Sequence, residues 1–293
     1  MTRAGTRLLA FAGWWVAVTL LVAWATGALA PLGIAGLPEP GPVTRIGLPV
    51  VQALRDMAAL LTVGLLVVAA TCLAPEPGSS ERSVTGVRRR AVQLAQGLAA
   101  AWLSGNLVLI GLVYSDASGS RLDAPGFWEQ AAFFATSYEL GQYLLWGAVL
   151  AAAVAATCAL ASSVAFLGVA ALLSLAGLWP MALTGHAAGT LQHIDAVNLQ
   201  MFHLVGIGVW AGGLLALVLL RPYLGTGAGA AIRHFSTLAT WGLLLVTVSG
   251  VLGAALRLPS PGAIVSTYGA LLGLKLAAVV VLAGLGHRQR HRL

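Results

Sequence analysis

Residues 181–217 read MALTGHAAGTLQHIDAVNLQMFHLVGIGVWAGGLLAL, and they concentrate polar side chains between two long apolar segments. The stretch contains three of the chain's six histidines and two of its three internal methionines, which are His186, His193, His203, Met181 and Met201. It also contains one acid, Asp195. Side chains that bind ligands are therefore expected to gather at one rim of an otherwise apolar structure.

The composition outside this stretch is that of a membrane protein. Hydrophobic residues make up 59% of the 293 residues and charged residues only 9%, whereas a soluble chain carries about 25% charged residues. The apolar runs are long and continuous, which excludes the alternating pattern of barrel strands. We expect an all-α, polytopic membrane helix bundle.

Eight segments have the length that a membrane-spanning helix needs, which is about 20 apolar residues. They cover residues 8–30, 49–74, 91–113, 138–159, 163–183, 199–220, 235–256 and 268–286. We expect two halves of four spans each, at residues 1–160 and 161–293. Aromatic residues in the 114–137 connection predict a short helix lying on the membrane surface.

The arginines predict the orientation of the bundle. With eight spans, eleven of them fall on one side, and these are Arg3, Arg7, Arg82, Arg88, Arg89, Arg90, Arg221, Arg233, Arg288, Arg290 and Arg292. Because cytoplasmic loops are enriched in Arg and Lys, both termini are expected in the cytoplasm and the protein in the plasma membrane. The net charge of +7 is thereby explained without nucleic acid as a partner.

The first span has a second interpretation. Arg3 and Arg7, an apolar run and then residues 28–30 (ALA) resemble a signal peptide with its cleavage site. The apolar run is longer than a typical signal core, so we expect the span to be retained. Cleavage would leave seven spans without inverting the others.

The polar rim contains ligands of two chemical kinds. Imidazole suits Cu(II) and Zn(II), and thioether favours Cu(I) over zinc. Topology places Met57 and the neighbouring Asp56 in the same outer leaflet as the rim. A metal site for copper, as Cu(I) or Cu(II), is therefore predicted from His186, His193, His203, Met181, Met201, Met57 and Asp56. In the alternative interpretation, the loop histidines are solvated and the methionines serve packing.

Some intramembrane residues have competing interpretations. His203 is predicted inside a span, where an ionisable side chain suggests a function by default, although a bond to a neighbouring carbonyl would also explain it. Asp56 is more simply explained by pairing with an arginine than by binding metal. Lys275 is expected to snorkel or to pair with Asp56 or Glu139. The glycines after His203 are expected to allow close helix packing.

Several motifs in the second half resemble the CopD family of copper-resistance membrane proteins. They are Gly185-His186-Ala187, His193, His203, Trp210-Ala211-Gly212-Gly213-Leu214, Arg233-His234-Phe235-Ser236, Ser249-Gly250, Tyr268-Gly269 and Leu274-Lys275-Leu276. Residues 62–64 (TVG) and Arg55 give a weaker match in the first half. The resemblance implies copper transfer across the plasma membrane, inward from an extracytoplasmic carrier of the CopC type. The oxidase-assembly domain of some relatives is not implied.

Three functions remain open from the sequence. The first is a copper permease or copper-handling protein, driven without ATP because no nucleotide-binding motif is present, and without enzyme activity. The second is a haem-binding redox protein with His203 as one axial ligand and His186 as a partner, although a second histidine inside a span is missing. The third is a structural or assembly partner in which the histidines only stabilise loops. Membrane lipid surrounds the protein in all three.

Overall fold

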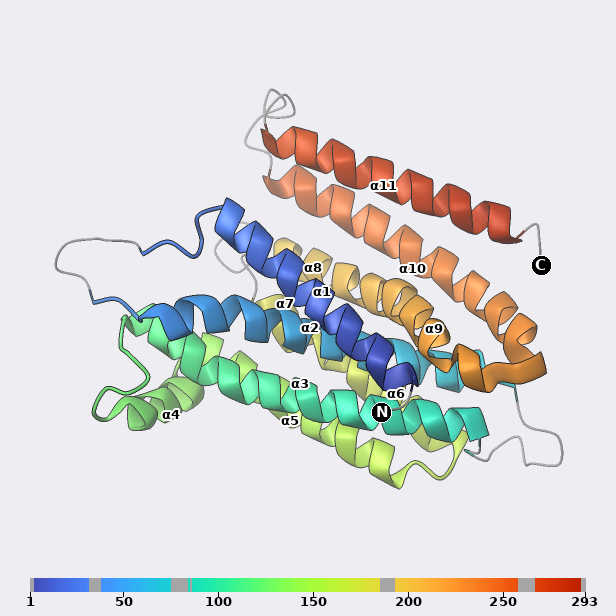
Figure 1. The fold of residues 1–293 in the computed structure, drawn as a ribbon, viewed down its shortest axis with the longest axis horizontal. Helices are drawn as coiled ribbons and strands as arrows, with labels where there is room; N and C mark the ends of the chain where they lie inside the picture. The colour runs from blue at the N-terminus through green and yellow to red at the C-terminus, as the bar shows by residue number, and fades with distance from the viewer. Residues whose placement is uncertain are drawn as a thin grey trace.

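The computed structural model describes residues 3–31, 38–74, 84, 86–184, 193–257 and 267–290, and these residues form helices and no strands. The α-helices are α1 (Arg3–Ala25), α2 (Pro42–Thr71), α3 (Gly86–Ser118), α4 (Phe127–Ser137), α5 (Glu139–Leu160), α6 (Val164–Ala176), α7 (Leu178–Leu183), α8 (His193–Ile207), α9 (Gly213–Leu224), α10 (Ala228–Arg257) and α11 (Thr267–Arg290). Two short elements join some of them: the π-helix η2 (Gly208–Gly212) and the 3₁₀ turn η3 (Gly225–Gly227). The predicted all-α fold is confirmed (Figure 1).

The helices have the length and composition of membrane spans. Six segments of the described chain qualify, and one of them is the 63-residue run Ile194–Leu256. This run consists of two helical segments, α8–η2–α9 and α10. The apolar part of α11, Leu272–Gly284, is shorter than these six segments. The protein is therefore a multi-pass membrane protein, while the count of eight spans stays a prediction.

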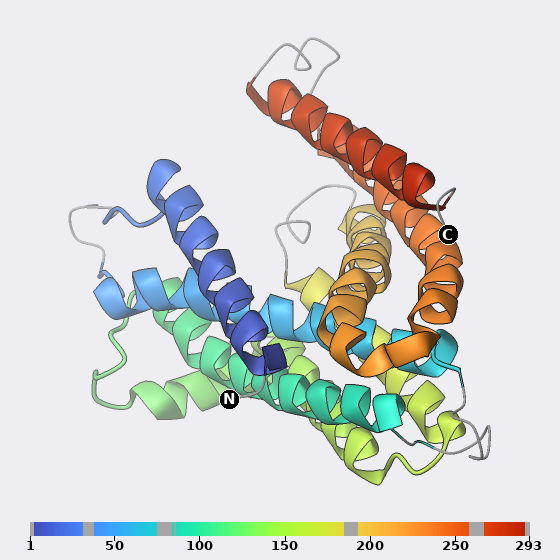
Figure 2. The ribbon, with the colours of Figure 1, turned by 45° about the vertical axis from the view of Figure 1, so that its right-hand side comes forward.

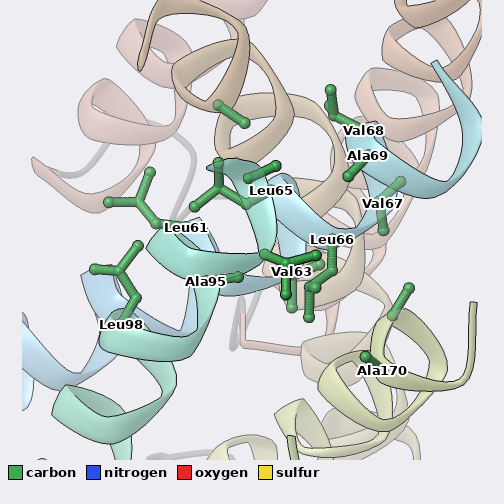
Figure 3. Packing of buried hydrophobic residues seen from close by; sticks show 14 of the residues in the cluster. Leu61, Val63, Leu65, Leu66, Val67, Val68, Ala69, Ala95, Leu98 and Ala170 are labelled. Atoms are coloured by element: carbon green, nitrogen blue, oxygen red, sulfur yellow. The ribbon is translucent and has the colours of Figure 1, made fainter. Parts of the chain in front are cut away.

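Helix α2 forms the centre of the bundle. In its most apolar 18-residue window 78% of the residues are buried, against 6% for α1. Figure 3 shows Leu61, Leu65 and Leu66 of α2 packed near Ala95 and Leu98 of α3, with Ala170 of α6 on another side. These contacts belong to one apolar cluster. Helices α1, α3, α6, α9 and α10 and the π-helix η2 all contact α2, which explains why so many of its residues are buried.

A close crossing joins α2 to the second half of the chain. A Cβ atom added at Gly64 of α2 would collide with the backbone of Gly212, and one added at Gly212 would collide with the carbonyl of Leu60. Only glycine allows two backbones to approach so closely. The predicted role of Gly212 in helix packing is therefore confirmed, at a place where the helix widens into η2.

Helices α8–α9 and α10 run antiparallel. His203 lies against Val246, whereas Gly213, further along the chain, lies against Phe235, which precedes Val246. Figures 1 and 2 show α10 between these two helices and α11. The apolar cluster around α2 includes residues of α9 and α10 and none of the described side chains of α11. The α8–α10–α11 group thus forms a second, more open part of the bundle.

Arg88 and Arg90 lie at one end of this bundle. Arg88 of α3 donates to the carbonyl oxygen of Leu73, just past the end of α2, over 2.6 Å, and Arg90 lies 5.5 Å from the ring centroid of Tyr223 at the end of α9. The opposite end carries α4 and a 2.7 Å hydrogen bond between Thr44 and Ser115. The position of Arg88 and Arg90 at the same end agrees with the predicted topology, in which both lie on one side of the membrane.

The boundaries of several spans differ from those expected. Helix α2 begins at Pro42 instead of residue 49, and α8 begins at His193 instead of residue 199. A span expected at 163–183 is divided into α6 and α7 at Gly177. The short helix expected within 114–137 is present as α4, and its Phe127 and Phe134 are buried. The polar residues at helix ends caused these errors, because a search for apolar runs stops before them.

Candidate metal site

His203 is attached to the neighbouring helix through one ring nitrogen. Its Nδ1 atom lies 3.1 Å from the carbonyl oxygen of Val246 and 3.2 Å from the Oγ atom of Ser249, both on α10. A carbonyl oxygen can only accept a hydrogen bond, so we assign the proton to Nδ1. The Nε2 atom then carries the lone pair, which is the form in which histidine binds a metal.

The position of His203 within its helix follows from the early start of α8. Ten residues, or about 15 Å of helix at 1.5 Å per residue, separate it from His193 at the first position. The ring is half-buried. A Cβ atom added at Gly250 would lie 3.3 Å from the Cε1 atom of His203, so the glycine provides room for the ring beside α10.

His203 lines a cavity of about 750 Å³ between α8, α10 and α11. Most of the lining is apolar, with Leu199, Val246 and Leu276 among the contributors. The polar and charged residues of the lining are Gln200, His203, Thr247, Ser249 and Lys275. A largely apolar cavity with a few convergent polar groups is the usual form of a binding site.

Lys275 is another residue in the lining of this cavity, and its exposure is compatible with the predicted snorkelling. It belongs to α11 and is exposed. Asp56, one of its two expected partners, forms an ion pair with Arg55 of its own helix instead, with 2.8 Å between Nε and Oδ1. Lys275 and His203 therefore line the same cavity.

The Arg55–Asp56 pair agrees with the interpretation of Asp56 as the partner of an arginine. Arg55 is only 4% exposed, and its Nη1 atom lies 3.4 Å from the Oδ1 atom of Asn106 on α3. Asp56 compensates the buried guanidinium, which would otherwise be costly in an apolar environment. The carboxylate thus has a structural role that does not need a metal.

The three methionines belong to the apolar core. Met57 of α2 and Met181 of α7 are buried, and Met201 of α8 packs against the same cluster. None of them appears in the lining of the cavity that contains His203. Their packing role is therefore present in the structure, and their role as ligands stays a prediction.

The two other predicted histidines lie at the edge of what the structure describes. His186 falls in residues 185–192, outside the described residues, and His193 begins α8 with a side chain that is also outside the description. Within the described part of the chain, no group of three or more His, Cys, Asp or Glu residues is close enough to hold a metal ion. Only His203 therefore has a described site geometry.

Ser249 is the main functional candidate that the sequence did not identify. Ser249 and Gly250 carried part of the family resemblance, but no role followed for them, because the pairing of α8 with α10 is invisible in the hydropathy. The cysteines need no functional explanation, since Cys72 and Cys158 are both buried within the apolar cluster. Burial in an apolar cluster is the ordinary situation of a free cysteine.

The fold and this site define a multi-pass helical membrane protein with a histidine in a cavity between its helices. A family model described as the copper resistance protein D-like N-terminal domain matches residues 43–194, and the copper resistance protein D model matches residues 229–293. Because the first match alone covers more than half of the chain, the chain belongs to the copper resistance protein D family. It is a copper-handling membrane protein. No curated protein and no solved structure matches the chain.

Proposed function

We propose that the protein moves copper across the plasma membrane and that Nε2 of His203 binds the ion in the cavity between α8, α10 and α11. The observation that carries this proposal is the attachment of Nδ1 to the carbonyl oxygen of Val246. Metal-binding histidines commonly donate their other ring N–H to a carbonyl or carboxylate, which fixes the ring and its tautomer. His203 has this arrangement, and imidazole is a suitable ligand for copper.

The ion enters, in this proposal, from the end opposite Arg88 and Arg90. The helix that carries His203 begins at that end with His193, and His186 precedes it in sequence. These two histidines would capture the ion before it reaches His203. Met57, Met181 and Met201 could bind the ion only if the apolar core around their thioethers opened. In this proposal they therefore contact the ion, if at all, after His203 does.

A soluble carrier of the CopC type is the proposed source of the ion. The same end of the bundle carries exposed acids, including Asp123 and Glu129. A hydrogen bond from Arg121 and its charge hold the pKa of Asp123 below its ordinary value. Asp123 is therefore ionised at neutral pH, and exposed acids at this end can attract a basic surface or a free cation.

A haem-binding function receives no support from the site. The described lining of the cavity contains one histidine, His203, and a second histidine facing it would be needed for bis-histidine ligation. Copper as the cargo needs no such partner on the facing helix. We therefore propose copper handling alone.

Transport into proteoliposomes tests the proposal. Copper trapped inside vesicles that contain the wild-type protein is compared with that in vesicles with H203A or H234A. His234 is an exposed histidine near the start of α10 and outside the cavity, so H234A is the matched control. We expect H203A to lose uptake and H234A to keep it. Separate measurements on vesicles with each orientation of the protein give the direction of transport. Equal uptake by wild type and H203A would contradict the proposal.

A further inference from the structure

The helix that carries His203 contains one residue more than a regular α-helix of its length would need. Between α8 and α9, residues Gly208–Gly212 form the π-helix η2. A π-helix is bonded from residue i to residue i+5, so a single π turn within an α-helix accommodates one extra residue. Such turns are frequent at functional sites. The face that α8 presents to its neighbours therefore depends on η2.

Glycines fit the observed register of α8 at its contacts with two other helices. A Cβ atom added at Gly206 would lie 2.9 Å from the carbonyl oxygen of Gly242 on α10. One added at Gly208 would lie 3.0 Å from the side chain of Val63 on α2. The extra residue in η2 thus places a glycine at each of these contacts, while His203, one turn before Gly206, faces α10.

A change of η2 into a regular α-helix would shift α8 by one residue. With α9 held in place, α8 would turn by about 100° and move about 1.5 Å away from α9. Leu204 would then take the present place of His203 beside α10. His203 would take the place of Phe202, which is 52% exposed and does not belong to the described lining of the cavity. The shift would therefore remove His203 from the cavity.

The same shift would widen the spacing between α8 and α10. Ile207 would replace Gly206 against α10, and Val209 would replace Gly208 against α2. A Cβ atom does not fit at the position of Gly206 with the present spacing of the helices, so α8 and α10 would have to separate. Shifts of one helix past another are a known form of switching between two states. A state that keeps the ion and a state that releases it are the two that a transporter needs.

We propose that η2 is a register switch for His203. In the observed register η2 is a π-helix and His203 lies in the cavity. In the second register residues 208–212 are α-helical and His203 lies outside the cavity. Copper at His203 favours the first register, because a ligand shifts a two-state equilibrium toward the state that it binds better. This inference rests on the proposed function, to which it adds the part of the protein that moves.

Deletion of Val209 tests the switch because it removes the extra residue. The close contacts of η2 with α2 and α10 involve Gly208, Trp210 and Gly212, so α8 and α9 keep their faces when η2 becomes α-helical. His203 then stays in the cavity, and a second register is no longer available. The matched control is V209A, which shortens the same side chain and keeps the extra residue. Copper affinity is measured by competition with a chromophoric chelator, and transport by uptake into proteoliposomes.

We expect the deletion to separate binding from transport. The deletion variant should bind copper as wild type and V209A do, but it should take up no more copper than vesicles without protein. Uptake equal to that of V209A would overturn the switch. A folded deletion variant that does not bind copper, when wild type does, would also overturn it, because the deletion would then have moved His203. Circular dichroism and gel filtration confirm the fold.

Cross-linking detects the two registers directly and needs neither copper nor the deletion. Cysteine replaces Ser249 together with either His203 or Leu204, in a chain that also carries C72A and C158A. The observed register brings residue 203 beside residue 249, and the second register brings residue 204 there. A short bifunctional methanethiosulfonate should link H203C to S249C and also L204C to S249C. In the deletion variant it should link only the first pair.

The cross-links separate failure of this inference from failure of the proposed function. If H203C is linked to S249C and L204C is not, α8 has a single register and the switch is overturned, even where wild type transports copper. If wild type neither binds nor transports copper, the proposed function fails, while the cross-links still report whether α8 has two registers. The cross-links also decide the matter if the deletion variant does not fold.

Discussion

The Nδ1 atom of His203 lies 3.1 Å from the main-chain carbonyl oxygen of Val246, so a side chain of α8 is tied to the backbone of α10. A bond to the main chain does not depend on the identity of residue 246. It fixes the ring against rotation and assigns the lone pair to Nε2. The proposed binding of a metal by His203 therefore depends on the pairing of α8 with α10, two helices that are far apart in the sequence.

Removing the hydroxyl of Ser249 should weaken copper binding without abolishing it. The Oγ atom lies 3.2 Å from Nδ1 of His203, and loss of such a supporting contact typically costs about 10- to 100-fold in metal affinity. Because the bond to Val246 remains, we expect S249A to lie at the low end, about tenfold. Chelator competition measures the affinity. The control is T240A, whose hydroxyl bonds Ser236 on the same helix and which should bind as wild type does.

Replacement of Asp56 by Asn should lower stability and leave copper binding unchanged. The buried guanidinium of Arg55 would lose its ionic partner. We expect a loss of about 2 kcal/mol, less than the about 3–5 kcal/mol of a fully buried pair, because Asp56 is partly exposed. Thermal unfolding in detergent measures the stability. D123N removes the carboxylate of the exposed Arg121–Asp123 pair and should have little effect. A D56N variant with wild-type stability but no copper would make Asp56 a ligand.

An alanine at Gly64 should disrupt the junction between the two halves of the chain. Its Cβ would collide with the backbone of Gly212, and overpacking of this kind costs about 1–3 kcal/mol or more. The matched control is G97A in α3, where a Cβ meets nothing within 4 Å. Alanine has the higher helix propensity, by about 1 kcal/mol, so G97A should be neutral or stabilising. Equal unfolding temperatures for the two variants would show that the crossing is not tight.

The sequence predicts the individual helices better than their contacts. Long apolar runs are sufficient to predict both ends of α5 and α11 within a few residues. They also predict the end of α10, but this helix begins seven residues earlier than expected. Hydropathy does not indicate which helices are neighbours, so the contact of His203 with Val246 and Ser249 could not be anticipated. The resemblance did single out Ser249-Gly250, and the geometry now gives a physical reason: a hydroxyl beside Nδ1 and space beside the ring.

The methionines and Asp56 show a different limit of the sequence. Methionine is both a copper ligand and an ordinary core residue, and its position near an outer rim does not separate the two roles. The structure places Met57 and Met181 in the core. Adjacent residues on a helix point in different directions, yet the flexible side chain of Arg55 reaches Asp56. The sequence favoured an arginine as the partner of Asp56, and the structure identifies that arginine as Arg55.

Elemental analysis of the purified protein tests the binding of copper by His203 most directly. Wild type, H203A and H234A are loaded with copper in chloride buffer, washed and analysed for copper per chain. The account predicts that wild type and H234A retain copper and that H203A loses it. Copper retained equally by H203A and wild type would contradict the account and would place the ion elsewhere in the chain.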